Sequence, residues 1–488
     1  MKIVVIGAGP VGCLAGIYAA QRGHDVEVYE LRPGTLPQPI AIPNLLTDHT
    51  LPDMRSPDNS KPAEAKSINL ALSERGINAM RHAHRPDLLE SVLRDTIPMH
   101  SRMVHRRSKA GALTASAQAY DVHHRAILAA DRGGLNATLL DQLQKMPNAK
   151  VFFERKIAAA DFRAKTAKLQ NRSVSPPQET EIAYDLLIGA DGAHSATRSS
   201  LMKHTQMDFS QEYIDSFWCQ FEIPAKHTTS GPQFLIEPNY LHVWPAGDCL
   251  FIAIPSADKT FTCTLFLSRA IFAELESDPQ ALLLPFFAEK FPGVWPDLIT
   301  PDQLLAQFSK NPHLPLISIR CSPYHFSSAA VILGDAAHAM VPFYGQGMNA
   351  GLEDVRILFE QHLDVHPGPE GLSEALSTYS AERRPDALAI SQLAMQNYVE
   401  MRADVTSRLY LARKWVEERL SLWFPSLGWS TQYAGVSFEN EPYSRVKARA
   451  GYQKRVLEGL LGSLGVVGGF GVVTALWRVR HLLRVRVR

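Results

Sequence analysis

The sequence lacks several features that define common classes of protein. Its 488 residues carry 50 lysines and arginines against 49 aspartates and glutamates, so no global positive charge draws the chain to nucleic acid. Its five cysteines are widely spaced and form no CxxC pair, which argues against a clustered zinc site or a redox disulfide. The first apolar run, residues 2–7, is too short for the core of a signal peptide. These absences favour a reduced, intracellular protein with no metal centre and no nucleic-acid partner.

The composition is that of a large globular protein. Hydrophobic residues make up 45% of the chain, enough for two or three packed domains. Residues 2–32 read as a strand, a glycine-rich turn, a helix and a second strand, which is a βαβ unit. Residues 33–66 carry seven prolines and little periodicity, so we interpret them as an insertion loop. The chain is therefore expected to begin with an α/β domain.

The later segments predict two further regions. Alternating, β-rich runs between about residues 210 and 270 indicate an antiparallel sheet, and the segment 373–424 is strongly helical up to Pro425. We expect a discontinuous dinucleotide-binding domain at 1–205 and 320–375 and a substrate-binding sheet domain at 206–319. A C-terminal helical region should follow at 376–455. Parts of 73–125 are expected to contribute to the substrate pocket.

The first glycine motif predicts a dinucleotide site. Gly7, Gly9 and Gly12 form GxGxxG directly after a strand and at the start of a helix, where they allow a tight turn, admit a pyrophosphate and let helix and strand pack. The helix N-terminus then faces the phosphates. Eighteen residues after Gly12, Glu30 ends the second strand and is placed to bind a ribose. This motif alone does not distinguish FAD from NAD.

Two later motifs make that distinction. In YDLLIGADGAHSATR an apolar strand ends at Asp191, and in AAVILGDAAHAMVPFYGQGMNAG another ends at Gly334 and Asp335. Asp335 is expected to bind a ribityl or ribose hydroxyl. Backbone amides near Gly345, Gly347 and Met348 are expected to face the pyrimidine ring of a flavin.

The C-terminus carries the longest apolar run of the chain. Residues 459–477 are uncharged, long enough for a helix of roughly 28 Å, and flanked by cations on both sides. We predict a membrane anchor there, and basic residues on both flanks suit the mitochondrial outer membrane, with the remaining chain facing the cytosol. Two alternatives stay open: a buried helix, or helix pairing through the GxxxG of Gly465 and Gly469.

Taken in order, these motifs resemble the single-component FAD-dependent aromatic hydroxylases. The resemblance covers most of residues 1–455 and is carried by SINLALSERG, IPMHSRM, EPNYLHVWP, FTCTLF, LGDAAHA, PFYGQGMNAG and NYVEMRA. Within the family these strings are similar to the branch that hydroxylates L-kynurenine. The resemblance implies a Rossmann-like FAD domain of the glutathione-reductase and p-hydroxybenzoate-hydroxylase type, a substrate sheet, a C-terminal helical region and a membrane helix.

The resemblance also implies a set of binding residues. Arg102 takes the place of the family arginine that holds the substrate carboxylate, and Tyr120 and Tyr398 take the places of two tyrosines at the substrate. Asn349 corresponds to a residue near both flavin and substrate, and Arg132 to one that reaches FAD. The full set of expected FAD contacts is Gly7, Gly9, Gly12, Glu30, Arg132, Asp191, Gly334, Asp335, Gly347, Met348 and Asn349.

The chain departs from the family pattern at three places. Lys66 replaces an arginine before SINLAL, RGGLN replaces RENLN from Arg132 onward, and Phe343 with Tyr344 replaces a pair of phenylalanines. The RGGLN loop loses an acid and an amide. Tyr344 adds a hydroxyl near the expected substrate face.

The implied reaction is hydroxylation of L-kynurenine to 3-hydroxy-L-kynurenine, a step of tryptophan degradation towards NAD. It uses NADPH and O2 as co-substrates and passes through a C4a-hydroperoxyflavin. The amino group of an aniline activates its own ring, so no catalytic side chain is required. No second GxGxxG marks a separate NADPH domain.

Two other readings remain open. One is a related hydroxylase acting on another aromatic amine or acid, and the other is a membrane-tethered binding protein without a working flavin. A yellow purified protein would contain flavin, which both hydroxylase readings require and the binding-protein reading does not. No protein partner is indicated.

Overall fold

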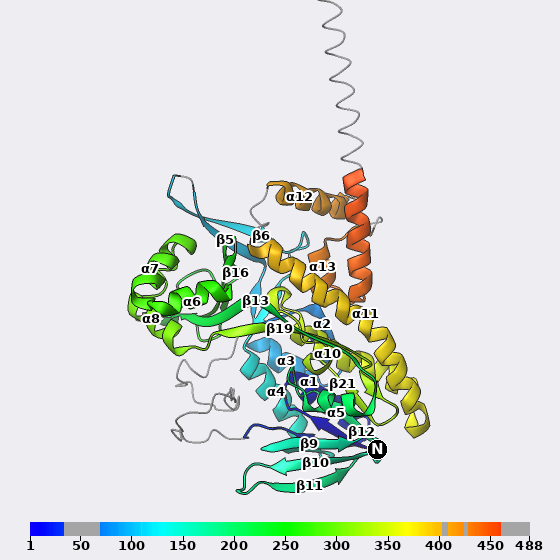
Figure 1. The fold of residues 1–488 in the computed structure, drawn as a ribbon. Helices are drawn as coiled ribbons and strands as arrows, with labels where there is room; N and C mark the ends of the chain where they lie inside the picture. Colours follow the sequence, from blue (N-terminus) through cyan, green and yellow to red (C-terminus); the bar gives the residue numbers. More distant parts are fainter. Residues whose placement is uncertain (34–68, 109, 403–407, 424–427, 460–488) are drawn as a thin grey trace, which may run out of the picture.

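The computed structural model describes residues 1–33, 69–108, 110–402, 408–423 and 428–459. The predicted insertion at 33–66 and the predicted anchor at 459–477 therefore lie, but for Pro33 and Gly459, outside the described residues. Among the described residues, no helix combines the length and apolar character needed to cross a bilayer. In this part of the chain the strands form two large sheets and three small ones (Figure 1).

The first large sheet is the dinucleotide-binding sheet. Its strands are parallel except at the β20–β21 edge, and β1 lies near the centre with every residue but the first buried. This burial on both faces explains the continuous apolar run KIVVI. The strand order is β20 (His325–Phe326), β21 (Ala330–Ile332), β12 (Leu186–Gly189), β1 (Lys2–Ile6), β2 (Asp25–Tyr29) and β8 (Ala149–Phe152).

Helices and a small sheet enclose this sheet. The helix α1 is buried over most of its length, because α4 and α10 pack against it. Apolar residues of the small sheet share the same core as the large one. The elements around the sheet are α1 (Pro10–Gln21), α2 (Glu74–Arg81), α3 (Pro86–Arg94), α4 (Arg132–Gln144), α5 (Ala196–His204), α9 (Asp335–His338), α10 (Gly347–Ile357), β9 (Arg155–Asp161), β10 (Thr166–Asn171) and β11 (Gln178–Ala183).

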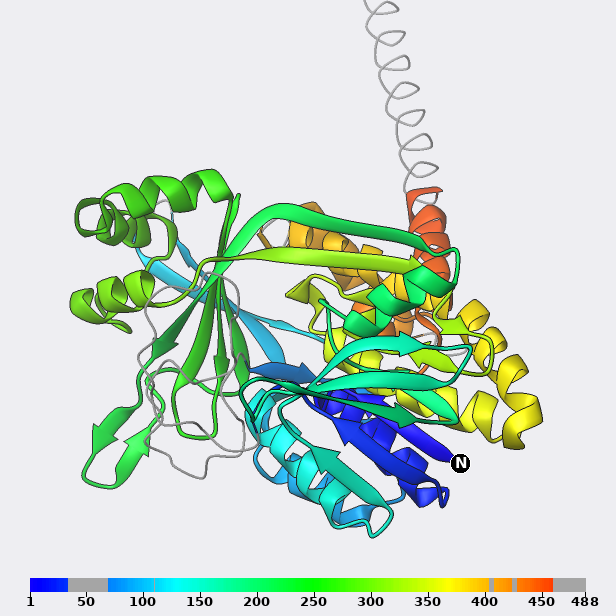
Figure 2. The same ribbon diagram turned by 60° about the horizontal axis from the view of Figure 1, so that its bottom comes forward.

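The second large sheet confirms the antiparallel sheet expected between residues 210 and 270. All its pairs are antiparallel except β16–β5, and the long strands β13 and β19 run from it toward the dinucleotide-binding sheet (Figure 2). Its strand order is β19 (Leu314–Ser322), β13 (Asp208–Ile223), β18 (Phe261–Leu267), β17 (Cys249–Pro255), β16 (Tyr240–Ala246), β5 (Ser101–Arg107) and β6 (Leu113–Ala119).

The pairing assigns some segments differently from the predicted domain limits. β5 and β6 pair with the substrate-side sheet although they lie outside the predicted sheet domain 206–319. They fall within 73–125, the segment that was expected to contribute to the substrate pocket. The predicted limit between residues 319 and 320 falls inside β19. Apolar residues of α6 (Arg269–Ser277), α7 (Pro279–Lys290) and α8 (Pro301–Lys310) cover one face of this sheet. Its other face packs on the C-terminal helices.

The remaining elements connect the two sheets and close the molecule. The described residues of the segment 373–424, which was predicted to be strongly helical, belong to α11 and α12. A further helix covers residues 443–459. The connecting and C-terminal elements are β3 (Leu70–Leu72), β4 (Ile97–Met99), β7 (Ile127–Ala130), β14 (Lys226–Thr228), β15 (Gly231–Gln233), η2 (Pro342–Tyr344), η3 (Leu358–Leu363), α11 (Gly368–Arg402), α12 (Arg408–Trp423) and α13 (Gln432–Ser437).

Candidate active site

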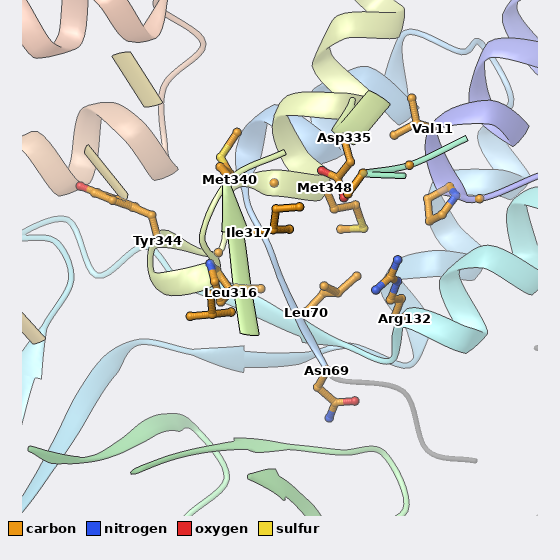
Figure 3. A pocket seen from close by; sticks show the side chains of 18 of the residues that line it. Val11, Asn69, Leu70, Arg132, Leu316, Ile317, Asp335, Met340, Tyr344 and Met348 are labelled. Atoms are coloured by element: carbon orange, nitrogen blue, oxygen red, sulfur yellow. The ribbon is translucent and has the colours of Figure 1, made fainter. Parts of the chain in front are cut away.

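A cavity of about 770 Å³ runs between the two large sheets. One end is lined by the β1–α1 turn, Glu30 and Arg132, and the other by Arg102 and Tyr433. Apolar side chains line the middle, where Leu70, Leu316, Ile317 and Met348 gather around the open space (Figure 3). A cavity of this size, apolar with few polar groups, suits a buried organic ligand.

The glycines of the β1–α1 turn have separate steric roles. A Cβ on Gly12 would lie 1.9 Å from the Gly7 oxygen, so only glycine fits there. Gly7 has φ +98°, in the region that favours glycine, and its Cβ would meet the Ala190 oxygen at 2.5 Å. A Cβ on Gly9 would meet no protein atom within 4 Å, although Gly9 lines the cavity. The turn is therefore closed toward the protein and open toward the cavity at the N-terminus of α1, which favours an anionic group.

Glu30 lies at the end of β2, as predicted, and its carboxylate is held by backbone. Its Oε2 accepts a hydrogen bond from the Ala8 amide at 2.7 Å, and its Oε1 accepts one from the Arg32 amide at 3.0 Å. These bonds orient the carboxylate beside the glycine turn, where it lines the cavity.

Asp191 lines the cavity, but its carboxylate is occupied by its own turn. It accepts hydrogen bonds from the Ser195 hydroxyl (2.6 Å) and from the Thr197 amide (2.9 Å) and hydroxyl (3.1 Å). Ser195 in turn caps α5 by accepting from the Arg198 amide. Asp191 thus shapes the turn after β12, and the backbone of that turn faces the cavity.

Asp335 and Arg132 both point into the cavity (Figure 3). Burial raises the pKa of Asp335, and the charge of Arg132 opposes that rise. Burial also lowers the pKa of Arg132, and Asp335 counteracts it. Gly334, with φ +57°, makes the turn before Asp335, and its amide donates to Asp354 Oδ2 at 2.8 Å. Asp335 thus presents a hydrogen-bond acceptor to a ligand, and Arg132 presents a cation with five N–H donors.

Gly347 and Met348 line the cavity at the start of α10, whereas Asn349 does not. The Asn349 side chain is completely buried, and backbone groups use its amide: Oδ1 accepts from the Ser73 amide (2.9 Å), and Nδ2 donates to the Ala71 and Gly345 oxygens (both 2.7 Å). Asn349 therefore ties β3 and α2 to the loop before α10, and its expected contact with flavin and substrate stays a prediction.

These residues fit a flavin dinucleotide. Gly9 leaves an open approach to a helix N-terminus, Glu30 and Asp335 offer acceptors along the wall, and Arg132 offers donors. The apolar middle section, with Met348 at its wall, is suited to a flat ring system.

The far end of the cavity is built around Arg102. This side chain lies on β5, is only 6% exposed and lines the cavity. Its Nη2 donates to Asn397 Oδ1 at 3.2 Å, and its Nη1 lies 3.4 Å from Glu400 Oε1. A buried guanidinium in a cavity wall is a strong candidate for binding a carboxylate.

A stack of three tyrosines stands beside Arg102. The Tyr433 ring stacks on Tyr120 with centroids 4.8 Å apart and on Tyr344 at 5.5 Å, and the Arg102 guanidinium lies 4.9 Å from the Tyr433 centroid. Burial raises the pKa of all three phenols, so they stay protonated. Tyr433 and Tyr344 line the cavity, whereas Tyr120 lies behind Tyr433. In Figure 3 the Tyr344 hydroxyl points away from the centre of the cavity, and the Tyr344 ring stacks on Tyr433 at the Arg102 end.

Tyr398 does not line the cavity either. Its hydroxyl donates to the Ser216 hydroxyl at 3.3 Å, and its ring stacks on Phe343 at 3.9 Å. The cavity-lining residues of this helix are Asn397 and Met401, four residues apart and hence on one face, with Tyr398 turned about 100° away. The position of Asn397 around the helix, relative to Met401, is a sequence signal that could have identified it as a cavity residue. For Tyr433 the sequence offered none, because the tertiary fold alone brings α13 to Arg102.

The chain matches known proteins over most of its length. A family model described as an FAD binding domain matches residues 1–394. Two relatives named kynurenine 3-monooxygenase come from Phaeosphaeria nodorum (53% identical, 98% of this chain and 93% of the relative) and Chaetomium globosum (51% identical, 95% and 97%). PqsL of Pseudomonas aeruginosa, solved in complex with 2-aminobenzoylacetate, aligns with a TM-score of 0.60 at 19% identity over 83% of this chain and 97% of that chain. This structural likeness shows a shared fold.

Proposed function

The chain belongs to the kynurenine 3-monooxygenase family of FAD-dependent hydroxylases, and from that membership we propose that it hydroxylates L-kynurenine to 3-hydroxy-L-kynurenine with NADPH and O2. It is a flavoprotein monooxygenase. One observation carries the proposal: a single cavity joins the glycine turn to a buried arginine flanked by aromatic rings. A carboxylate-bearing aromatic amine has groups that match that second end.

When bound, FAD would supply the redox chemistry that hydroxylation with NADPH and O2 requires. We assign its binding to the glycine turn, Glu30, Arg132 and Asp335, with Gly347 and Met348 at the ring. Gly7, Gly12, Asp191 and Gly334 shape the turns around it. The substrate ring activates its own ortho carbon through the amino group, so none of these side chains has to act as a base.

The protein positions the substrate and excludes water. Arg102 is assigned to the substrate carboxylate, while Glu400, whose Oε1 lies 3.4 Å from Arg102 Nη1, balances the charge of the buried guanidinium. Asn397 holds the Arg102 fork by accepting from its Nη2, and it donates to the Phe343 oxygen at 2.6 Å. Tyr433 forms the aromatic wall, and Tyr120 supports it from behind. The apolar middle section keeps water from the reacting ring.

The test is NADPH consumption by purified protein with and without L-kynurenine, with the product identified by mass. We expect a strong rise in rate and a product one oxygen atom heavier. L-Tryptophan, which has the same amino-acid end and no aniline, serves as the control. A rise without an oxygenated product means that L-kynurenine acts only as an effector and contradicts the proposal.

We also propose that the chain is anchored in the mitochondrial outer membrane through residues 459–477, with the flavin domain facing the cytosol. The support is the uncharged run of nineteen residues between two groups of cations. Deleting residues 460–488 is expected to make the protein extractable from isolated mitochondria with alkaline carbonate, which removes surface-bound proteins and leaves membrane-spanning ones. A truncated protein that resists this extraction as the full chain does contradicts the anchor.

A further inference from the structure

The helix α12 exposes an aromatic face. Trp415 is 53% exposed, Leu422 41% and Trp423 62%, values that are high for side chains of this size. These residues and Arg419 are spaced i, i+4, i+7 and i+8, which places all four on one side of a helix. We call this set, Trp415, Arg419, Leu422 and Trp423, the tryptophan face. An exposed apolar surface with two tryptophans indicates a contact with another phase or molecule.

The charges around the tryptophan face are mainly positive. The Arg419 guanidinium lies 5.5 Å from the centroid of the Trp415 ring, within the face itself. α12 carries four cations and two acids, and the acids are used locally, Glu417 by Arg413 at 2.8 Å and Glu418 by Lys414 at 3.7 Å. The combination of indole rings and guanidinium groups suits the headgroup layer of a membrane, where both side chains are enriched.

The neighbouring helix, residues 443–459, has the same character. Both helices line one small cavity, through Ser421 of α12 and Arg449 of the second helix. Tyr452 on the second helix is 62% exposed. Residues 443–459 carry five cations and one acid, and one of these cations, Arg449, is paired with Glu439 and Glu441 at 2.8 and 2.7 Å. Figure 1 shows α12 running across the end of this helix at which the described chain stops. The sequence continues from that end into the uncharged run of residues 460–477.

We propose that the tryptophan face and Tyr452 lie in the interfacial layer of a bilayer that contains anionic phospholipid, with α12 parallel to the membrane plane. The occupant is lipid because the surface joins aromatic side chains to an excess of cations beside the predicted anchor. A second contact of this kind fixes the orientation of the flavin domain on the membrane, which an anchor alone leaves free. The proposal rests on the membrane attachment proposed above and is independent of the reaction.

The test uses the full chain in vesicles of phosphatidylcholine with phosphatidylserine, in which the acyl chains are brominated near the headgroup and quench nearby tryptophans. The chain has seven tryptophans. We expect the double variant Trp415→Leu, Trp423→Leu to lose at least about half of the quenched fluorescence. The control Trp477→Leu, which removes the tryptophan of the predicted anchor, is expected to retain the quenching due to α12. Trp423→Leu alone gives a smaller loss and serves if the double variant folds poorly.

Any of these vesicle results overturns the proposal: equal quenching in the wild type and the double variant, quenching by α12 that does not depend on phosphatidylserine, or no association with vesicles. A dimer in detergent that the double variant converts to a monomer assigns the face to a second copy of the chain and also overturns it. NADPH consumption with L-kynurenine, measured on the same samples, tests the reaction separately. The double variant is expected to keep both FAD and activity.

Discussion

The two ends of the cavity are built in different ways. The dinucleotide end consists of turns that are continuous in sequence, and its central contacts are made by backbone: Gly7, Gly9 and Gly12 lie within six residues, and Glu30 is held by backbone amides. The arginine end gathers single side chains from β5, η2, α11 and α13, which are up to 331 residues apart. A site made of backbone can be recognised from a short motif, whereas a site made of dispersed side chains depends on the whole fold.

The largest effect is expected at the glycine turn, where two alanine variants separate folding from binding. Gly12→Ala places a Cβ 1.9 Å from the Gly7 oxygen, so it should lower the free energy of unfolding by about 1–3 kcal/mol and abolish FAD binding. Gly9→Ala meets no protein atom and should leave the apoprotein as stable as the wild type while losing FAD. Thermal unfolding and flavin absorbance measure the two quantities. A Gly9→Ala protein that keeps FAD would falsify the role of the open turn.

The next effect is expected at the opposite end of the cavity. Arg102→Met keeps the bulk of the side chain and removes its charge, so kcat/KM for L-kynurenine should fall by about 100-fold with FAD retained. Arg102→Lys restores the charge without the fork and should recover part of that loss. Steady-state kinetics and flavin content are the measurements. Wild-type kinetics in Arg102→Met would remove this arginine from the substrate site.

A smaller effect on KM distinguishes Tyr398, which family resemblance selected, from Tyr433, which the structure places in the cavity wall. Tyr433→Phe removes a hydroxyl in the wall beside Arg102 and should raise KM for L-kynurenine by about fivefold. Tyr398→Phe removes only a hydrogen bond to Ser216, outside the cavity, and should change KM by less than about twofold. The reverse order of the two KM values would favour the residue that sequence resemblance selected.

The smallest expected effect is on the acid stability of the protein, through two histidines of the substrate-side sheet. His105 Nε2 lies 2.8 Å from His242 Nδ1, and burial lowers their pKa values to about 3 and about 4 from an ordinary 6.5. Between about pH 6.5 and pH 4 the unfolded chain binds more protons than the folded one, so stability is full above pH 6.5 and falls as the pH drops through this window.

The measurement is the midpoint of thermal unfolding at pH 7.5 and at pH 5.5. His105→Phe keeps a ring in the stack on Trp244 and should reduce the difference between the two midpoints. His227→Gln, which replaces an exposed histidine on β14, should leave it unchanged. An undiminished difference in His105→Phe would show that other groups cause the acid sensitivity.

The residues selected from the sequence also differ between the dinucleotide end and the arginine end of the cavity. Gly7, Gly9, Glu30, Arg132, Asp191, Asp335, Gly347 and Met348 were selected from motifs or from family resemblance, and the structure places them in the wall of one cavity, with Gly12 and Gly334 in the turns behind it. Asn349 and Tyr398 were selected by resemblance, and the structure uses both for internal hydrogen bonds. Asn397 and Tyr433, which the sequence analysis did not select, line the cavity. A string such as NYVEMR identifies a helix at the site, but only helical phase decides which of its residues faces the ligand.

The sequence by itself determined the α/β class and the position of the dinucleotide turn. These depend on local geometry: strand burial, glycine sterics and the spacing of a motif are set within about thirty residues. Arg102, in contrast, was selected by family resemblance and not by local geometry. Only the tertiary structure decided that Tyr433 stacks between Tyr120 and Tyr344 and that Asn397 contacts Arg102. Those contacts join distant segments, and they form only because both sheets and the C-terminal helices pack into one core.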